Sequence, residues 1–389
     1  MKLNATSTVA QQFSLMKPKI WLSSPHMSGN EQAYIKEAFD SNWVAPLGPN
    51  VNGFEIDLQS YLKEDRYVAA LASGTSALHL SLILLGVANG DEVICQSKTF
   101  SASAYPIVYQ GATPIFVDSE RETWNMCPLQ LEIAIKDRIA KGKTPKAIIA
   151  VHLYGMPYKV DEINQIALKY DIPVIEDSAE ALGSNYKGQK CGTFGDFSIL
   201  SFNGNKIITT SGGGALVTKT LPQKEKAVFL ATQARDHAPH YLHSHIGYNY
   251  RMSNIIAGIG RGQMTILDSH VAKRRSNHQF YVDAFKDNKN IIFLEEPEGC
   301  FSNRWLSCIL LDSKSTREGL RLALENENIE SRPLWKPMHQ QPIFKDAPNY
   351  LNGVSDELFE KGLCLPSGSN LTDIERNRIV KAVNTYFNS

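Results

Sequence analysis

Short apolar runs alternate with amphipathic segments over the first two-thirds of the chain, and this alternation constrains the fold more than any other feature. Runs of this kind suit strands buried on both faces, and the segments between them have helical spacing. Alternating strands and helices form a mostly parallel sheet covered by helices on both sides. The predicted strands are Tyr67–Leu71, Glu92–Gln96, Thr113–Val117, Ala147–Val151, Pro173–Glu176, Phe197–Leu200 and Ala215–Thr218, and the predicted helices are Thr75–Leu85, Leu129–Ile139 and Val160–Tyr170.

The pattern changes after about Ile255, where a long helical stretch containing Lys273, Arg274 and Arg275 leads into shorter strands and helices. We predict an α/β fold with a large domain, built on a mostly parallel seven-stranded sheet flanked by helices, and a smaller C-terminal α/β domain. The expected divisions are a flexible arm at 1–20, the large domain at 21–260 and the small domain at 261–389. Ligands of such sheets bind at the carboxyl ends of the strands.

Charge and cysteine content exclude several classes of protein. Lysine plus arginine and aspartate plus glutamate number 40 each, so the formal net charge is zero, which gives no support to a nucleic-acid partner. No run approaches the roughly 20 apolar residues of a membrane span, and no secretory signal is visible. The 6 cysteines lack paired C-x-x-C spacing. We therefore expect a cytoplasmic protein with reduced thiols, no metal and no membrane insertion.

Asp177 is the first candidate for chemistry, because it stands at the end of the apolar run in VIEDSAEALGS. A carboxylate at the carboxyl end of a parallel strand faces the crevice where ligands bind. It suits an anion that pairs with the protonated ring nitrogen of a cofactor. The alternative is a helix N-cap before Ser178–Leu182.

Lys206 is the second candidate and lies in a short polar loop in SILSFNGNKIITTSGGGALV. In a partly desolvated crevice the neutral amine is favoured, and the amine is a nucleophile for carbonyl carbon. The glycines at 212–214 allow the backbone to approach a bulky ring closely. A solvated lysine beside a tight turn is the alternative. The motif G-x-G-x-x-G is absent after the first predicted strand, which argues against a nicotinamide oxidoreductase.

The segment ALASGTSALHLSL places Ser73, Gly74 and Thr75 in a turn between a predicted strand and a predicted helix. Free N–H groups and a hydroxyl at a helix start bind phosphate, although an ordinary Ser/Thr cap has the same sequence. Phe100, just past the next strand, suits either stacking on a cofactor ring or core packing. A phosphate cradle, an aromatic, a strand-end aspartate and a glycine-flanked lysine, in this order, predict pyridoxal 5'-phosphate as the cofactor.

From about Ile20 to its end, the chain resembles the DegT/DnrJ/StrS family of sugar-nucleotide aminotransferases, which have the fold type I architecture of pyridoxal phosphate enzymes. Within that family it looks most like the PglE-type enzymes of bacillosamine biosynthesis. The segments that carry the resemblance are SSPHMSGNE, SNWVAPLGPNVNGFE, EDSAEALGS, SFNGNKIITTSGGG, TQARD, GYNYRMSN, SNRWLS and SRPLWKPMH.

The resemblance implies a role for each matching residue. Lys206 would form the Schiff base with the cofactor and move the proton, and Asp177 would pair with the pyridine nitrogen. The other implied cofactor contacts are Gly74, Thr75 and Ser201 at the phosphate, Phe100 against the ring, and Glu180 near the phenolic oxygen, where many relatives have glutamine or histidine. Asn203, Arg332, Trp335 and His339 resemble residues near the sugar nucleotide, with core packing as the alternative for Trp335.

Asn249 in GYNYR resembles an asparagine that reaches the cofactor phosphate of the neighbouring subunit, which implies a homodimer with shared active sites. The implied reaction moves the amino group of L-glutamate to a UDP-linked 4-keto-6-deoxy-N-acetylhexosamine, for bacterial glycan biosynthesis. The alternatives are a 3-keto or dTDP-linked nucleotide sugar and a non-catalytic homologue that binds pyridoxal phosphate. Dehydratases of the family replace the lysine with histidine, and Lys206 disfavours that reaction.

Overall fold

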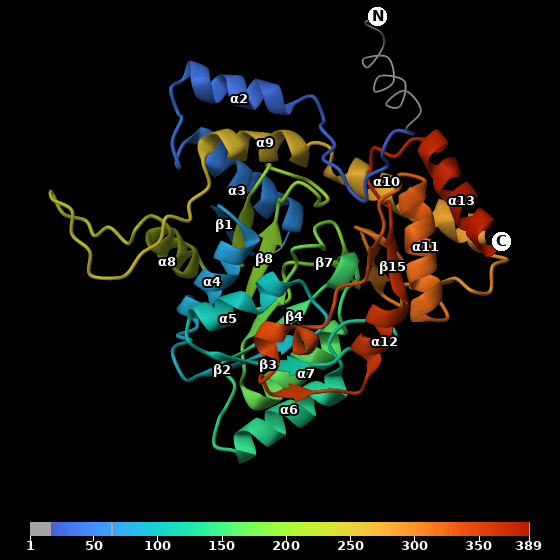
Figure 1. Cartoon of the computed structure of the whole chain (residues 1–389). Coiled ribbons are helices and arrows are strands. Elements are labelled where there is room, and N and C mark those ends of the chain that lie inside the picture. The colour runs from blue at the N-terminus through green and yellow to red at the C-terminus, as the bar shows by residue number, and fades with distance from the viewer. Residues whose placement is uncertain (1–16, 64, 389) are drawn as a thin grey trace, which may run out of the picture.

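The computed structural model describes residues 17–63 and 65–388 (Figure 1). Residues 1–16 of the predicted flexible arm lie outside this range. Ile20, at the end of that predicted arm, is buried and forms a parallel bridge with Ile329. Its N–H donates to the Asn328 carbonyl at 3.0 Å, and its carbonyl accepts from the Glu330 N–H at 2.8 Å. The division of the chain at 20 and 260 stays a prediction.

A mixed, mainly parallel sheet forms the centre of the molecule, in the order β1-β9-β8-β5-β4-β2-β3-β14. Strand β9 runs antiparallel to both of its neighbours, and the other neighbouring pairs are parallel. The strands are β1 (Tyr67–Leu71), β2 (Glu92–Gln96), β3 (Thr113–Val117), β4 (Ala147–Val151), β5 (Val174–Asp177), β8 (Phe197–Ser201), β9 (Gly214–Thr218) and β14 (Asn349–Tyr350).

Seven of these strands match the predicted ones, and the eighth corrects the predicted strand number. Strand β14 comes from the C-terminal part of the chain and adds to the edge beside β3. Two residues are too short to give a periodic signal, so the sequence pattern did not reveal it. Strand β5 also extends one residue further than expected, so that Asp177 is its last residue.

Helices cover both faces of the sheet because alternate side chains of the strands are apolar on each side. Ile149 packs with one cluster that includes residues of α4, whereas Ile148 packs with another that includes residues of α6 and α7. The helices around the sheet are α2 (Glu31–Asp40), α3 (Pro49–Leu62), α4 (Gly74–Leu84), α5 (Tyr105–Tyr109), α6 (Pro128–Ala140), α7 (Val160–Tyr170), α8 (Leu221–Ala231) and α9 (Asn254–Met264).

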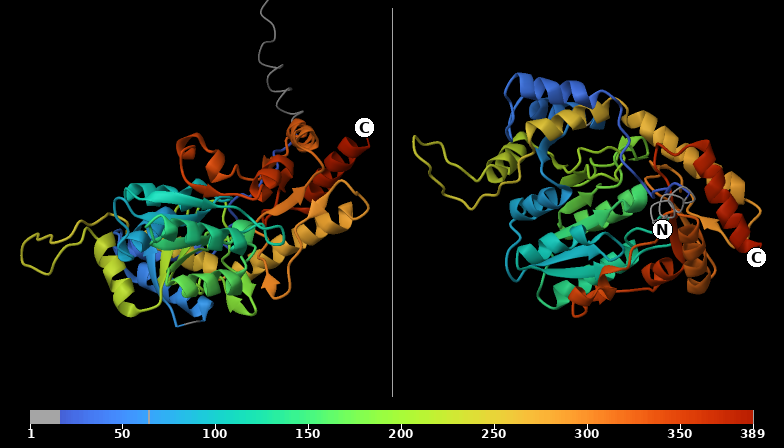
Figure 2. Two further views of the ribbon diagram at one scale, coloured as in Figure 1. Left: turned by 90° about the horizontal axis from the view of Figure 1, so that it is seen from below. Right: turned by 45° about the horizontal axis from the view of Figure 1, so that its top comes forward.

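The single long helix expected after Ile255 is two helices, α9 and α10 (Leu267–Phe285), which Thr265 and Ile266 separate. Helix α10 leads into a second sheet of order β10-β12-β15-β13, visible on the right of Figure 1 and again in Figure 2. The strands of this sheet are β10 (Ile292–Phe293), β12 (Ser307–Leu310), β13 (Arg332–Pro333) and β15 (Gly362–Leu365). The helices of this part of the chain are α11 (Lys314–Asn326), α12 (Val354–Lys361) and α13 (Asp373–Phe387).

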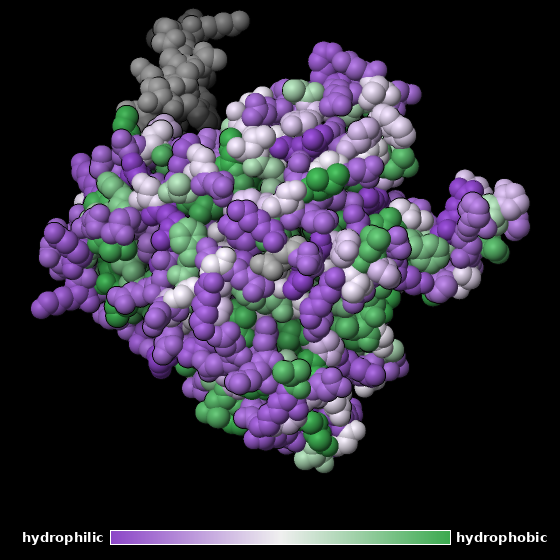
Figure 3. All heavy atoms as spheres, turned by 180° about the vertical axis from the view of Figure 1, so that it is seen from behind, coloured by the Kyte–Doolittle hydropathy of each residue, from purple (hydrophilic) through white to green (hydrophobic). Residues whose placement is uncertain are grey.

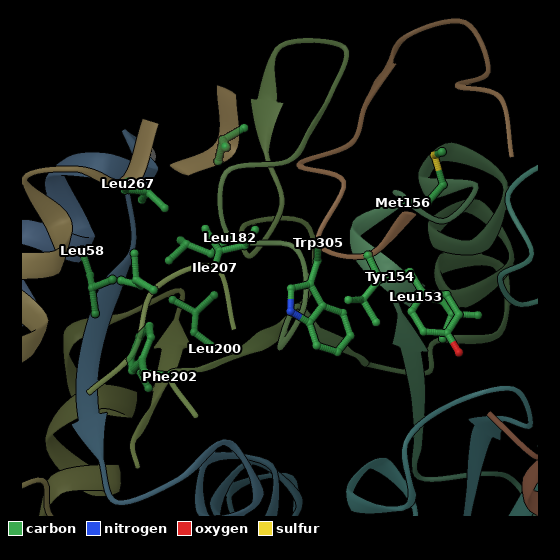
Figure 4. Packing of buried hydrophobic residues seen from close by; sticks show 14 of the residues in the cluster. Leu58, Leu153, Tyr154, Met156, Leu182, Leu200, Phe202, Ile207, Leu267 and Trp305 are labelled. Atoms are coloured by element: carbon green, nitrogen blue, oxygen red, sulfur yellow. The ribbon is translucent and has the colours of Figure 1, made fainter. Parts of the chain in front are cut away.

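A small third sheet joins the two parts of the chain, because β11 (Cys300–Phe301) pairs with β6 (Asn185–Tyr186), which in turn pairs with β7 (Gln189–Lys190). The main core is continuous across this junction, where Trp305 lies near Ile207 and Leu182 and extends toward Tyr154 (Figure 4). The segment that follows β11 therefore packs against the loops at the carboxyl edge of the main sheet, and it closes one side of the candidate site.

One segment leaves this packed body. The chain between α8 and α9 extends outward as a long arm, seen in all three overall views (Figures 1, 2 and 3). Tyr241 and Ile246 within it are 78% and 83% exposed. Hydrophilic and hydrophobic residues are interspersed over the face in Figure 3.

No helix of the described residues is long and apolar enough to cross a membrane.

Candidate active site

A cavity of about 320 Å³ opens at the carboxyl ends of β4, β5 and β8, beside the start of α4. This is the edge at which ligands of open α/β sheets bind. The cavity brings together most of the residues that the sequence nominated. Those that line it are Gly74, Thr75, Phe100, Asp177, Glu180, Ser201, Asn203, Lys206 and Trp335.

Lys206 projects from the loop between β8 and β9, and its side chain is only 13% exposed. Its Nζ lies 4.1 Å from the centre of the Trp305 ring and 3.5 Å from Glu180 Oε1. A cation near an aromatic face and a carboxylate is attracted by both groups. The amine is therefore held at a defined point of the cavity.

Asp177 is buried, with 6% of its surface exposed, at the end of β5. Ser103 Oγ donates to its Oδ2 at 2.6 Å, and the Ala179 N–H donates to its Oδ1 at 3.1 Å. Burial raises the pKa of this carboxyl, although these two hydrogen bonds and the charge of Lys206 act against that rise. A cation brought into the cavity next to Asp177 would stabilise its charged form.

Glu180 is also buried, and it faces Lys206. Burial raises its pKa to about 7, and the Lys206 charge together with the Tyr154 N–H only partly offset this effect. That N–H donates to Glu180 Oε2 at 2.6 Å. A carboxyl with a pKa near neutrality exchanges a proton readily at physiological pH.

The start of α4 forms a cradle with free backbone donors. Ser73 is the N-cap, and its hydroxyl accepts from the Ser76 N–H. The N–H groups of Gly74 and Thr75 occupy the first helical positions, where no intrahelical acceptor exists. A Cβ on Gly214 would collide with the Gly74 nitrogen, so glycine is required where β9 passes this turn. This close approach is between two segments of the chain itself, and the predicted approach of the triple glycine to a cofactor ring stays a prediction.

Aromatic side chains pack around Trp335, which lines the cavity together with Phe100 and Trp305. The Trp335 ring centre lies 5.4 Å from that of Phe100, 5.2 Å from that of Tyr154 and 6.1 Å from that of Trp305. The Trp335 backbone is fixed as well, because its N–H donates to the Tyr154 hydroxyl and its carbonyl accepts from Lys98 Nζ, both at 2.9 Å. Phe100 remains 56% exposed, so it is available to a ligand rather than consumed in the core.

Sequence reasoning missed three residues of the site, namely Ser103, Tyr154 and Trp305. Tyr154 has φ 54° and ψ 22°, a left-handed conformation that is rare for a bulky residue and that concentrates at functional sites. The signal for Trp305 was present in SNRWLS, but a buried tryptophan has no periodic signature of function. Ser103 and Tyr154 carried no comparable signal.

Three predicted residues lie away from the cavity lining. Arg332 is exposed on β13 and pairs with Glu330 at 2.5 Å. His339 is held by the Ser97 hydroxyl at 2.7 Å and lies 2.9 Å from Asp356. Asn249 is exposed at the base of the projecting arm, where it forms a bridge with Thr232. A single chain does not bring these three residues to Lys206.

The fold and this cavity match those of sugar aminotransferases that use pyridoxal phosphate, as comparison with known proteins shows. The structure matches "Putative sugar aminotransferase Spr1654" from Streptococcus pneumoniae in its PLP-form with a TM-score of 0.87, at 28% identity over 95% of this chain and 98% of that chain. The chain belongs to the DegT/DnrJ/EryC1/StrS aminotransferase family, whose model matches residues 25–384. The predicted fold class, aminotransferase activity and cofactor are thereby confirmed.

Two curated relatives match over nearly the whole chain. "Putative pyridoxal phosphate-dependent aminotransferase EpsN" of Bacillus subtilis (strain 168) is 51% identical over 378 residues, which cover 96% of this chain and 97% of that protein. GDP-perosamine synthase of Escherichia coli O157:H7 is 36% identical over 367 residues, with 93% and 97% covered. The family assignment therefore holds over almost the full length of the chain.

The residues of the cavity fit this cofactor. The start of α4 offers backbone donors to a phosphate, and the buried Asp177 carboxylate suits a protonated ring nitrogen. Lys206 supplies an amine within the same space. Phosphate, ring nitrogen and aldehyde thus each find a matching group.

Proposed function

We propose that this chain transfers an amino group from L-glutamate to the keto group of a nucleotide-linked sugar, with Lys206 as the lysine that bonds the cofactor. The observation that carries the proposal is the position of Lys206 Nζ, 3.5 Å from Glu180 and 4.1 Å from the Trp305 ring, in the same cavity as Asp177. Pyridoxal phosphate supplies an aldehyde that exchanges between amines and a ring that accepts electron density.

The chain's own groups then orient that chemistry and move protons. Lys206 Nζ carries a proton to and from the substrate carbon, and Glu180, whose pKa is about 7, exchanges a proton with Lys206. Asp177 would hold a negative charge beside the ring nitrogen, and Ser103 fixes the direction of that carboxylate. Gly74, Thr75 and Ser201 line the cavity and would bind the phosphate, and Phe100 would lie against the ring. The donor and the sugar use the same cavity in turn, so we expect ping-pong kinetics.

The proposed acceptor is a UDP-linked 4-keto-6-deoxy-N-acetylhexosamine. The resemblance of EDSAEALGS and GYNYRMSN to the bacillosamine branch supports it. Asn203 and Trp335 line the cavity and would face the sugar. A GDP-linked sugar is the second candidate, because relatives named GDP-perosamine synthase are 34–36% identical to this chain.

The proposed working unit is a homodimer with shared active sites. The projecting arm supports it, since Tyr241 and Ile246 are exposed and Asn249 lies outside its own chain's cavity. In a dimer each arm would carry Asn249 to the partner's phosphate cradle. Mixing Lys206→Ala chains with Asn249→Ala chains tests this arrangement, because about a quarter of the sites in random dimers regain both residues. Recovered activity supports the shared site, and mixtures as inactive as their parents contradict it.

The visible absorption spectrum of the purified protein tests the proposed reaction. We expect a band of bound cofactor that bleaches with L-glutamate and returns with the UDP-linked 4-keto sugar. The same glutamate-treated protein is also offered GDP-linked and dTDP-linked keto sugars. A band that returns only with one of these keeps the reaction and replaces the acceptor. A band that glutamate does not bleach contradicts the proposed donor.

A further inference from the structure

Arg274 on α10 is a buried cation behind the Lys206 loop. Only 1% of its surface is exposed, and burial lowers its pKa to about 9. None of the ion pairs found within residues 17–63 and 65–388 includes it. A buried guanidinium without a carboxylate is costly, and its hydrogen bonds must compensate for lost solvation. The groups that accept hydrogen bonds from Arg274 therefore indicate why the chain buries this cation.

Those acceptors belong to the backbone of the active site. Arg274 Nη1 donates to the Trp305 carbonyl at 2.6 Å, and Nη2 donates to the Lys206 carbonyl at 3.4 Å. The side chains of these same two residues meet inside the cavity, with Lys206 Nζ 4.1 Å from the Trp305 ring centre. The Arg274 guanidinium thus fixes the distance between the backbones of Lys206 and Trp305, whose side chains contact each other in the cavity.

A closed ring of hydrogen bonds reinforces this spacing. Arg274 Nη2 also donates to Ser23 Oγ at 3.0 Å, and Ser23 Oγ donates to the Asn205 carbonyl at 2.7 Å. The Trp305 indole Nε1–H donates to that same carbonyl at 2.7 Å. The ring therefore passes from Arg274 through Ser23 and Asn205 to Trp305 and back to Arg274.

Helix α10 holds the Lys206 loop at a second point. His270 lies one turn before Arg274, and its Nδ1 donates to the Ile207 carbonyl at 3.1 Å. Burial lowers the pKa of His270 to about 4, so the ring is neutral at physiological pH. Two side chains of one helix face thus bind the carbonyls of two consecutive residues, those of Lys206 and Ile207.

We propose that Arg274 is a positioning residue that fixes Lys206 against Trp305 and thereby aims its amine into the cavity. This inference rests on the proposed role of Lys206. Arginine suits the task because its planar fork serves several acceptors in fixed directions, whereas a lysine amine is a single flexible point. Without the Arg274 guanidinium, the 205–207 loop and Trp305 would move independently. The Lys206 amine would then lose its contact with the Trp305 indole.

Amine labelling of the cofactor-free protein tests this inference directly. In Arg274→Met we expect Lys206 to react several-fold faster with an amine-reactive ester, read by peptide mass spectrometry, because its side chain is no longer held at 13% exposure. Arg317→Met is the matched control. Arg317 is also a buried arginine that donates to a backbone carbonyl, that of Glu360 at 3.2 Å, but it lies on α11 and does not touch the 205–207 loop.

In the loaded enzyme, Arg274→Met should slow the glutamate half-reaction by about 10²-fold at saturating glutamate, as expected for a misplaced reacting group. Arg317→Met should leave this rate nearly unchanged, because Arg317 lies on α11 and does not touch the 205–207 loop. Equal labelling and equal rates in the two variants would overturn the inference. If instead Lys206→Ala retained turnover, the proposed function would fail first.

If Arg274→Met does not fold, Arg274→Lys and Trp305→Phe form a double-mutant cycle. Trp305→Phe removes the indole N–H from the ring of hydrogen bonds but keeps an aromatic side chain beside Lys206. Effects on labelling and rate that are clearly non-additive support a common network. Additive effects contradict it.

Discussion

Two buried carboxylates near the end of β5 have the same burial and opposite protonation behaviour. Burial pulls the pKa of Glu176 upward, but hydrogen bonds from His152 and from the Gly192 N–H outweigh it and lower the pKa to about 2. Burial raises the pKa of Glu180 to about 7, because Lys206 and one N–H offset it only in part. The number of donors, not the depth of burial, separates a structural carboxylate from a reactive one.

Glu176 belongs to a cluster with His152 and Cys191 whose residue types suit a metal ion. The Glu176 oxygens, however, accept from His152 Nε2 at 2.7 Å, from Ser198 Oγ at 2.8 Å and from backbone N–H groups. His152 Nδ1 accepts from the Tyr158 N–H at 3.1 Å. The lone pairs that Glu176 and His152 would offer to a metal are already engaged, so this cluster stabilises the carboxyl end of the interior strand β5. The site around Lys206 leaves its groups available for a ligand.

Replacing Lys206 in the reactive site should have the largest effect on the transamination rate. In Lys206→Ala we expect the transamination rate to fall by at least about 10⁴-fold, the upper range for a lost proton-transfer group. The cradle at α4 and Asp177 remain, so pyridoxal phosphate should still bind without a covalent bond. Turnover assays and equilibrium dialysis measure the two properties. Lys190→Ala, at a partly buried lysine outside the cavity, serves as control, and residual turnover near the wild-type rate would contradict the assignment.

Asp177→Asn should have the next largest effect, because an amide keeps the shape but loses the charge beside the ring nitrogen. We expect a fall of about 10²- to 10³-fold in the rate of the glutamate half-reaction, comparable to the loss of one electrostatic partner in other active sites. Stopped-flow absorbance measures it. Asp196→Asn, at the opposite end of the same sheet, should change the rate little. Equal rates in the two variants would separate Asp177 from the chemistry.

The sequence predicted the residues of the reactive site around Lys206 better than the structural carboxylate Glu176. Asp177 and Lys206 lie on short segments whose residue types carry chemistry, and the parallel sheet brings their strand ends together, whereas Glu180 was predicted from the resemblance alone. Trp305 reaches the cavity through long-range packing, and no local pattern encodes that approach. Asn249, Arg332 and His339 rested on the resemblance alone, and the single chain leaves them outside the cavity. Strand β14 was missed because it is paired by tertiary contacts rather than by its own two residues.

Glu176→Gln addresses the structural carboxylate. We expect the free energy of unfolding of the cofactor-free protein to fall by about 3 kcal/mol at pH 7, because a buried partner of His152 and several N–H groups is removed. The folded pKa of Glu176, about 2, lies below its unfolded value, so its stabilisation is present above about pH 4.5 and is lost as the pH falls toward 2. Urea unfolding at several pH values measures this. A constant difference between variant and wild type over that range would contradict the assigned charge.

Glu180→Gln should change the free energy of unfolding least. Its effect on stability should depend on pH in the direction opposite to that of Glu176→Gln. The folded pKa of Glu180, about 7, lies above its unfolded value, so the folded chain binds more protons between about pH 4.5 and 7. The wild type therefore loses stability relative to the glutamine variant as the pH rises through this window. We expect a change of about 2 kcal/mol, less than the full linkage slope because the cavity is open to water.

The two glutamate variants thus test one comparison from both ends by the same urea titration. In the cofactor-free protein, the stability difference of Glu176→Gln should grow with pH up to about 4.5, and that of Glu180→Gln should change between about 4.5 and 7 in favour of the variant. If both variants changed stability in the same pH window, the contrast in donors at Glu176 and Glu180 would not explain their charge states. Separate windows would mean that the chain keeps Glu176 charged to stabilise the carboxyl end of β5 and leaves Glu180 poised to exchange a proton with Lys206.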